Sequence, residues 1–310
     1  MKAFHSDRFV LPLPPGHRFP MSKYAALRER VAADLPGVAL HEPPAAGEDM
    51  LALAHDAQYV QRVLAGGLSS AEQRAIGFPW SVEMVERSRR SVGATIAACQ
   101  AAATEVVAVN LAGGTHHAHR DRGQGYCVFN DAAIAAGLLC RDDVKARVAI
   151  IDLDVHQGDG TAAILGASER VFTLSLHGQN NYPARKVAGH LDIGLPDGTG
   201  DAQYLEALDR ALEAMVERFT PTFIVFLAGA DPHEGDRLGR LRLTFDGLRA
   251  RDGRVFELAD RLRAPVAVTM AGGYGHDVAT TVQAHFNTVH AAFRHWQRCR
   301  IRQGVETGIA

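Results

Sequence analysis

The sequence predicts a three-layer α/β fold, in which a mainly parallel, doubly wound sheet lies between helices. Two observations support this fold class. Short runs rich in β-branched residues alternate with longer amphipathic or alanine-rich segments, which is the pattern of parallel strands joined by crossover helices. The 310 residues also contain no Pro/Ser-rich linker, internal repeat or low-complexity block, so residues 1–310 are expected to form a single domain.

The N-terminal part contains a segment that is unsuited to regular structure. Residues 11–20, with the sequence LPLPPGHRFP, are rich in proline, which interrupts helices and is poorly tolerated in strands. We therefore expect a surface loop. It forms either the rim of a pocket or a stiff entry to a helix over residues 21–31.

Helices and strands alternate from residue 81 onwards. Each expected helix carries enough apolar positions at helical spacing to cover one face of a sheet, and each expected strand is a short apolar run. The expected helices are residues 81–103, 131–140, 201–218, 246–262 and 278–297, and the expected strands are residues 106–110, 148–153, 171–175, 223–227 and 266–270.

The composition narrows the class of protein. The formal net charge of -2 gives no basic surface for phosphate backbones, so no direct contact with nucleic acid is expected. The four cysteines are widely spaced without a Cys-x-x-Cys pair, which indicates reduced thiols in a cytoplasmic protein. No apolar run resembles a signal peptide or reaches membrane-spanning length, so no membrane association is expected.

The strand over residues 148–153 leads into the most informative residues of the chain. Because side chains alternate along a strand, Asp152, Asp154 and His156 should point to one side. An apolar strand of this kind is normally buried, where an unpaired carboxylate is costly, and a divalent cation would remove that cost. The alternative is a buried polar network or salt bridge at the end of the strand.

Polar residues also follow the other expected strands, at the edge where open α/β sheets bind ligands. Glycines flank many of them, which favours a shared crevice over chance. These residues are His116, His117 and His119 after the first strand, Asp154, His156 and Asp159 after the second, His177 after the third, Asp231 and His233 after the fourth, and Tyr274 and His276 after the fifth.

Three of these residues are candidate metal ligands. Asp154 and His156 supply an oxygen and a nitrogen from one strand end, and Asp231 offers a carboxylate from another. Three protein ligands with an open position hold catalytic Zn²⁺, which activates water and polarises a carbonyl group. The set therefore predicts a metal-dependent hydrolase. Fe²⁺ or Co²⁺ would fit the same ligands.

Proton transfer would need further groups at the same edge. The adjacent His116 and His117 are the candidates for general acid–base work. Asp152 and Asp159 could each accept the second ring proton of a histidine and fix its tautomer, so we expect two His–Asp pairs. His119 is expected to be an imidazole on the surface.

Tyrosines in glycine-containing loops complete the candidate site. Tyr274 stands on a turn formed by Gly272 and Gly273 and is the candidate donor to an oxyanion, although a packed aromatic ring is the alternative. Tyr126, which follows Gly125, and Tyr182, which precedes a proline, suit the walls of a narrow apolar channel.

With these residues assembled, five ordered motifs resemble those of the histone deacetylase superfamily. The resemblance runs from about residue 14 to the last helix, and it is strongest to the class IV branch and its bacterial relatives. The motifs are GGTHHA at 113–118, GYCVFND at 125–131, DLDVHQGDG at 152–160, GDRLG at 235–239 and GGY at 272–274.

The resemblance implies the arginase/deacetylase fold, with an eight-stranded parallel sheet, and hydrolysis of the amide of an acyl-lysine. It implies zinc on Asp154, His156 and Asp231, acid–base work by His116 and His117 backed by Asp152 and Asp159, transition-state stabilisation by Tyr274, and an acyl-lysine channel flanked by Tyr126 and Tyr182. It further implies a possible K⁺ near Asp152, Asp154, His156, Ser175 and Leu176.

Several alternatives stay open at this point. Acyl-lysine in proteins or peptides, acetylated polyamines and other small acetylated amines all present an amide on a thin aliphatic stem, and His17 and Phe19 are candidates for selecting among them. An arginase-like enzyme with two metal ions would need a carboxylate at position 158, which is Gly158. A catalytically silent acyl-lysine binding module is disfavoured, because Tyr274 and all the candidate catalytic and ligand residues are present.

Overall fold

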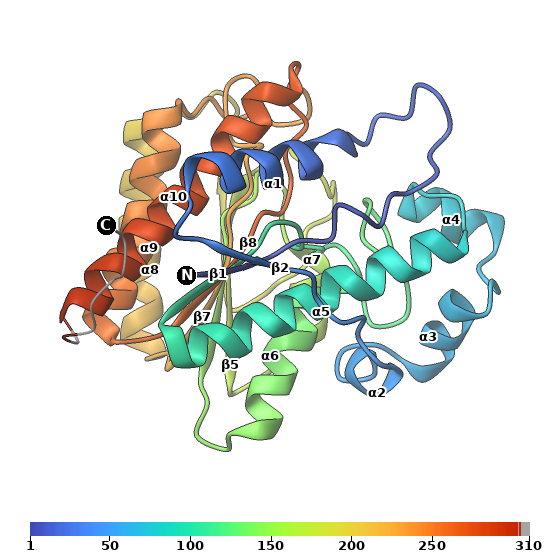
Figure 1. The fold of residues 1–310 in the computed structure, drawn as a ribbon, viewed down its shortest axis with the longest axis horizontal. Coiled ribbons are helices and arrows are strands. Elements are labelled where there is room, and N and C mark those ends of the chain that lie inside the picture. Colours follow the sequence, from blue (N-terminus) through green and yellow to red (C-terminus); the bar gives the residue numbers. More distant parts are fainter. Residues whose placement is uncertain (303, 305–310) are drawn as a thin grey trace.

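The computed structural model describes residues 1–302 and 304, and these residues build a three-layer α/β fold (Figure 1). Its eight-stranded sheet has the order β2-β1-β3-β8-β7-β4-β5-β6, and every neighbouring pair is parallel. The predicted fold class is therefore confirmed. The strands are β1 (Lys2–Phe4), β2 (Ala39–His41), β3 (Val107–Asn110), β4 (Val148–Asp152), β5 (Val171–Gly178), β6 (Leu191–Leu195), β7 (Phe223–Leu227) and β8 (Val266–Thr269).

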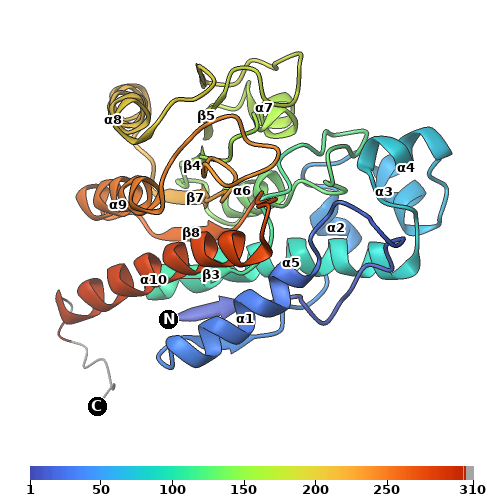
Figure 2. The same cartoon turned by 90° about the horizontal axis from the view of Figure 1, so that it is seen from above.

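Helices cover both faces of the sheet. They are α1 (Ser22–Asp34), α2 (Glu48–Leu51), α3 (Ala57–Leu64), α4 (Ser70–Ile76), α5 (Val82–Glu105), α6 (Asp131–Asp142), α7 (Asp159–Leu165), α8 (Asp201–Arg218), α9 (Phe245–Leu262) and α10 (Val278–Arg302). Seen from above, α1, α8, α9 and α10 lie on one side of the strands, and α5, α6 and α7 lie on the other (Figure 2).

The central strands are buried on both faces, and their side chains alternate between two apolar cores. In β7, Ile224 and Phe226 belong to the core under α8, α9 and α10, whereas Val225 and Leu227 belong to the core under α5 and α6. This two-sided burial explains why the central strands are continuous apolar runs. No helix in the described part of the chain is both long and apolar enough to cross a membrane.

The strands and helices expected from the sequence are all present, with ends shifted by a few residues. Strands β1, β2 and β6 escape the sequence analysis. β1 and β2 have only 3 residues each, and β6 is a half-buried LDIGL segment at the edge of the sheet, so none of them forms a long apolar run. The short helices α2, α3, α4 and α7 are missed for the same reason, because a few residues show no clear helical period.

His55 is a buried neutral histidine, and its burial is expected to reduce the stability of the protein in acid. His55 accepts a hydrogen bond from Asn130 N at 2.9 Å, and burial lowers the pKa of His55 from 6.5 to about 4. In the unfolded chain the His55 imidazole takes up a proton near pH 6.5, whereas in the folded chain it takes up this proton only near pH 4. The contribution of His55 to stability is therefore complete above pH 6.5 and is lost as the pH falls towards 4.

Urea unfolding at pH 7 and pH 5 measures this effect. His55→Gln keeps an acceptor for Asn130 N but cannot titrate, so it should reduce the drop in unfolding free energy between the two pH values by about 1–2 kcal/mol. The exposed His276, changed to Gln, is the control for loss of an imidazole. A drop of equal size in wild type and His55→Gln would contradict the prediction.

Candidate active site

A cavity of about 500 Å³ lies where the carboxyl ends of the central strands meet. Strands β3, β8, β7 and β4 are consecutive neighbours in the sheet, so the residues that follow them converge at one edge. The walls of the cavity include His116, His117, Asp154, His156 and Tyr274. The structure therefore brings together side chains from distant parts of the chain, as predicted from the polar residues that follow the strands.

Asp154, His156 and Asp231 form a compact group of possible ligands, whose ligand atoms all lie within 4.8 Å of one another. His156 Nδ1 is 3.0 Å from Asp154 Oδ1 and 3.2 Å from Asp231 Oδ2. Asp231 Oδ2 is buried and makes no hydrogen bond to the described residues. Burial, followed by the charge of Asp154, raises the pKa of Asp231 to about 7. A cation would relieve this repulsion, so the oxygen and nitrogen donors fit a metal ion.

The path by which Asp154 and His156 meet differs from the prediction. β4 ends at Asp152, and the chain then bends at residues 154–156 instead of continuing as a strand. The bend is held by hydrogen bonds from Asp154 N to Asp152 Oδ1 at 3.2 Å and from His156 N to Asp154 Oδ1 at 2.9 Å. Leu153 and Val155 nevertheless share one apolar core, as the alternation predicts. Asp152 and Asp154 both face His116, whose Nδ1 is 2.6 Å from Asp152 Oδ2 and whose Nε2 is 3.9 Å from Asp154 Oδ1.

Two histidines lie beside the ligand group, and each is paired with a buried carboxylate. His116 Nδ1 is 2.6 Å from Asp152 Oδ2, and His117 Nδ1 is 2.6 Å from Asp159 Oδ1. The two imidazole rings have their centroids 4.1 Å apart. The structure thus contains the two expected His–Asp pairs.

The environments of the two histidines push their pKa values apart. Burial disfavours the charged form of both rings, but at His116 the carboxylates of Asp152 and Asp154 outweigh burial and raise the pKa to about 9. At His117, burial and the neighbouring His116 lower the pKa to about 3. A neutral His117 can accept a proton, whereas a protonated His116 can donate one or stabilise negative charge.

His119 is buried, so its expected position on the surface is wrong. Its Nε2 lies 2.9 Å from Asp159 Oδ2, and Gln124 Nε2 donates to the same oxygen. Arg122 Nη2 is 3.2 Å from the other ring nitrogen. Asp159 therefore orients His117 with one oxygen while its other oxygen is fixed by His119. The spacing of two residues between His117 and His119 was the sequence signal that both imidazoles could reach the same partner.

Tyr274 is held in the cavity wall through its backbone. Its N–H donates to Asp236 Oδ2 at 2.6 Å, and its carbonyl accepts from Arg237 Nε at 2.9 Å. Asp236 Oδ1 accepts from the N–H groups of Leu238 and Gly239, which fixes the carboxylate. Sequence reasoning identified these residues only as a motif. Burial raises the pKa of Tyr274 well above its usual range, so the hydroxyl stays protonated and can donate.

Aromatic residues form the walls of the cavity. Gly125 has a φ of +56°, and a Cβ atom there would lie 2.7 Å from His117 Cδ2, so only glycine allows this approach. The Tyr126 ring lies 5.2 Å from Phe19, and the Tyr182 ring meets His117 edge-on at 4.8 Å. Since Phe19 belongs to the proline-rich segment, that segment is a wall element as well as the entry to α1.

A second catalytic metal is disfavoured at Gly158. A Cβ atom there would lie 2.3 Å from Asp152 Oδ2 and 3.4 Å from His116 Cβ. The carboxylate that a binuclear enzyme needs at this position would therefore displace the His116–Asp152 pair. This geometry favours one catalytic metal ion.

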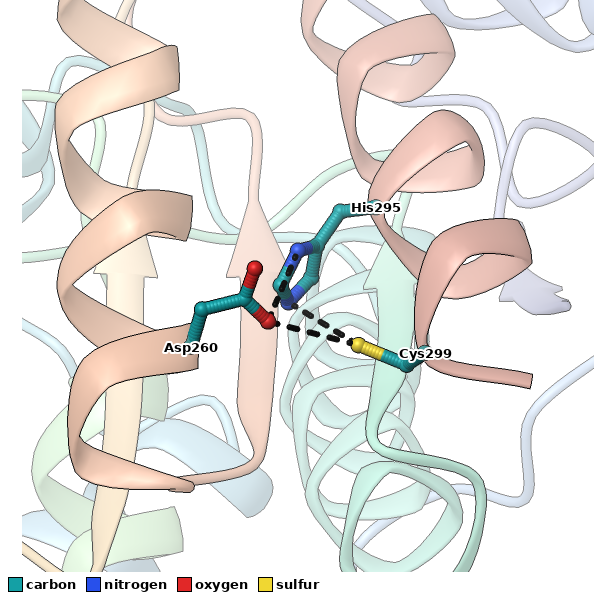
Figure 3. Close-up of side chains that lie close together, drawn as sticks. All are labelled: Asp260, His295 and Cys299. Carbon is teal, nitrogen blue, oxygen red and sulfur yellow. Dashed lines mark hydrogen bonds and ion pairs between the residues drawn. The ribbon is translucent and has the colours of Figure 1, made fainter. Parts of the chain in front are cut away.

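Asp260, His295 and Cys299 form another group of possible ligands, located between α9 and α10 (Figure 3). Cys299 Sγ lies 3.5 Å from Asp260 Oδ1 and 3.7 Å from His295 Nε2. Burial raises the pKa of Cys299 to about 11, so the thiol remains protonated and donates. The other oxygen of Asp260 pairs with Arg302 at 3.3 Å. We interpret this group as a polar link between two helices.

Comparison with known proteins agrees with the fold. The model of the histone deacetylase domain matches residues 17–289. The chain is 39% identical over 293 residues to an uncharacterized protein of Picosynechococcus, covering 94% of this chain and 97% of that protein. It is 35% identical over 174 residues to an acetylpolyamine amidohydrolase of Burkholderia pseudomallei, covering 51% and 48% of the two chains. The crystal structure of an HDAC homolog from Aquifex aeolicus has the same fold, with a TM-score of 0.81 and 24% identity over 94% of this chain and 84% of that chain.

The fold and these similarities define a hydrolytic enzyme of the deacetylase and amidohydrolase class. The chain belongs to the histone deacetylase family. The resemblance found in the sequence motifs is thereby confirmed. The family is metal-dependent, and the Asp154, His156 and Asp231 group offers donors for such an ion.

Proposed function

We propose that this enzyme hydrolyses the amide of Nε-acyl-lysine in proteins or peptides. The observation that carries the proposal is the buried Asp154, His156 and Asp231 group, in which two carboxylates share one imidazole, at the cavity that also holds His117 and Tyr274. Asp231 Oδ2 makes no hydrogen bond among the described residues. Two buried carboxylates so close together are costly, and a divalent cation at this point would offset the cost.

In this proposal, Zn²⁺ is held by Asp154, His156 and Asp231, and Fe²⁺ or Co²⁺ would suit the same donors. When bound, the ion supplies activation of water and polarisation of the substrate carbonyl. The K⁺ site is implied by the resemblance, and the sheet register agrees with it in one respect, because Asp152 of β4 pairs with Ser175 of β5, next to Leu176. That site stays a prediction.

Side chains of this protein carry out the proton transfers and stabilise the negative charge. His117, which is neutral, accepts a proton from the attacking water, and Asp159 fixes its tautomer. His116, paired with Asp152, stabilises the negative charge and can protonate the departing lysine amine. The Tyr274 hydroxyl donates to the carbonyl oxygen as negative charge develops there.

The mouth of the cavity favours acyl-lysine over acetylpolyamine. Arg74 and Arg240 are exposed lining residues, although Arg240 pairs with Asp197. Among the described lining residues, the only carboxylate is the deep Asp154. A free polyamine is a polycation and would meet Arg74 at this mouth and a carboxylate, Asp197, that is already paired with Arg240, whereas a peptide backbone needs no anionic partner. Small acetylated amines remain the second candidate, supported by the Burkholderia relative.

Turnover on a substrate panel tests the proposal. Acetyl- and longer acyl-lysine peptides should be hydrolysed, chelation should abolish turnover, and Zn²⁺ should restore it. Activity on acetylpolyamines alone would assign the enzyme to small-molecule substrates. Peptide binding that persists without metal and without turnover would instead support a silent binding module. The class IV relationship, the single domain over residues 1–310 and the cytoplasmic location stay predictions.

A further inference from the structure

Lys23 is a buried cation in the wall of the catalytic cavity that the proposed mechanism does not use. It belongs to α1, lines the cavity, and is only 2% exposed. Its Nζ donates to the carbonyl of Gly273 at 3.2 Å. In the part of the chain that the structure describes, no carboxylate pairs with it. A buried ammonium group normally needs an anionic partner, and this one has none among the described residues.

Three aromatic rings surround the Lys23 ammonium group. Its Nζ lies 5.2 Å from the ring centroid of Tyr24, 5.3 Å from Tyr274 and 5.9 Å from Phe19. Such contacts hold a cation in place, but they do not use its remaining N–H donors. Because these three aromatic residues also line the cavity, the unused donors can be reached by a ligand in it.

Lys23 lies on the side of the cavity that carries Gly273 and Tyr274, close to the candidate ligand group. The carbonyl it binds belongs to Gly273, the residue after Gly272, whose N–H donates to Asp154 Oδ2 at 2.7 Å. Arg74 and Arg240 are exposed lining residues and mark where the cavity meets solvent. A lysine stem entering from the mouth would bring its acyl group, rather than its backbone, towards Lys23.

A second polar group beside Gly273 also lacks a partner. His285 is 1% exposed, and neither of its ring nitrogens makes a hydrogen bond within the described residues. A Cβ atom on Gly273 would lie 3.2 Å from His285 Nε2, which places the imidazole against the same turn. Burial, followed by the positive charge of Lys23, lowers the pKa of His285 well below its usual range. The surroundings of Gly273 therefore contain polar groups that the described residues leave without an anionic or hydrogen-bonding partner.

We propose that Lys23 forms a carboxylate-binding subsite for acyl groups that end in an acid, such as malonyl- or succinyl-lysine. This inference rests on the proposed function and specifies its substrate class. Hydrolysis of such an amide consumes one water, breaks the C–N bond, and releases the lysine amine and the free dicarboxylic acid. The reaction thus needs no further reactant.

A pair of nearly isosteric substrates isolates the charge. Peptides carrying succinyl-lysine and succinamyl-lysine differ in whether the acyl chain ends in a carboxylate or in a neutral amide. We expect kcat/KM of the wild-type enzyme to be about 10- to 100-fold higher for the succinyl peptide, the range of a hydrogen bond to a charged group. Lys23→Gln should bring this ratio close to about 1, and Lys23→Arg should keep most of it, because the positive charge remains.

The ratio separates recognition of the acid from a structural role of Lys23 in holding Gly273. A structural role would lower both rates together and leave the ratio unchanged, and that outcome would overturn the inference. If Lys23→Gln does not fold, as judged by circular dichroism, the wild-type ratio alone decides, and equal rates on the two peptides refute the subsite. Hydrolysis of acetyl-lysine without preference for succinyl would leave the proposed function standing. Failure on every acyl-lysine peptide would refute the function itself.

Discussion

Tyr274→Phe is expected to lower kcat by about 10²- to 10³-fold, while the enzyme keeps its metal ion. The substitution removes only the hydroxyl of a residue that lines the cavity, and that hydroxyl stays protonated because burial raises the pKa of Tyr274. The backbone bonds to Asp236 and Arg237 do not involve the ring, so the loop should keep its position. Single-turnover kinetics on an acetyl-lysine peptide, together with elemental analysis, measures both quantities.

Tyr126→Phe is the matched control. Its ring stands in the same wall, 5.9 Å from the ring of Tyr274, but we assign its hydroxyl no catalytic role. The control should change kcat by only a few fold. If Tyr274→Phe were as active as Tyr126→Phe, the oxyanion donor would have to be another group. If Tyr274→Phe lost its metal, the separation of catalytic residues from ligands would be wrong.

Asp231→Asn is expected to abolish metal binding and turnover without weakening the metal-free protein. The substitution keeps an oxygen that can accept from Val155 N, as Asp231 Oδ1 does at 2.9 Å. It also removes one charge from a site where burial and Asp154 raise the pKa of Asp231 to about 7. The metal-free variant should therefore melt at the same temperature as metal-free wild type or higher. The rise in Tm that Zn²⁺ gives the wild type by binding the folded state should be absent.

Asp260→Asn provides the control for Asp231→Asn, because Asp260 belongs to the other Asp/His/Cys group. We expect this variant to retain about one metal ion per chain and full turnover, since the polar link between α9 and α10 is not part of the cavity. Elemental analysis and calorimetric melting curves with and without Zn²⁺ report on both variants. If Asp260→Asn lost its metal ion and Asp231→Asn kept it, the group that contains Asp260 would be the metal site and the group that contains Asp231 would not.

The central part of the fold is the part that the sequence predicts best. Strands such as β4 and β7 are buried on both faces, so they are continuous apolar runs, and the chemistry-bearing residues follow directly at their carboxyl ends. The formation of β1 and β2 depends on their pairing with neighbouring strands, because their own composition does not favour a strand. Three residues carry too little periodicity to be recognised.

The site shows the same division between local pattern and tertiary contact. The His–Asp pairs could be anticipated because the residues are adjacent to strand ends, but the partner of each imidazole is set by folding. The bend at residues 154–156 is closed by hydrogen bonds between residues only two apart, which the apolar pattern of the strand does not reveal. The burial of His119 depends on Asp159, which is 40 residues away along the chain. Lys23 was missed altogether, because on α1 it is one basic residue in an amphipathic helix. Only the packing of α1 against the Gly273 turn reveals it.

The sheet order separates what must stay fixed from what can vary. Asp154 and Asp231 follow β4 and β7, which are adjacent inner strands, and Tyr274 follows β8, the next neighbour. The outer wall comes instead from irregular segments that carry Phe19 and Tyr182. Mutational tolerance should therefore be highest around the entrance. Directed evolution confined to those segments could redirect the enzyme towards new amides without rebuilding the reaction centre.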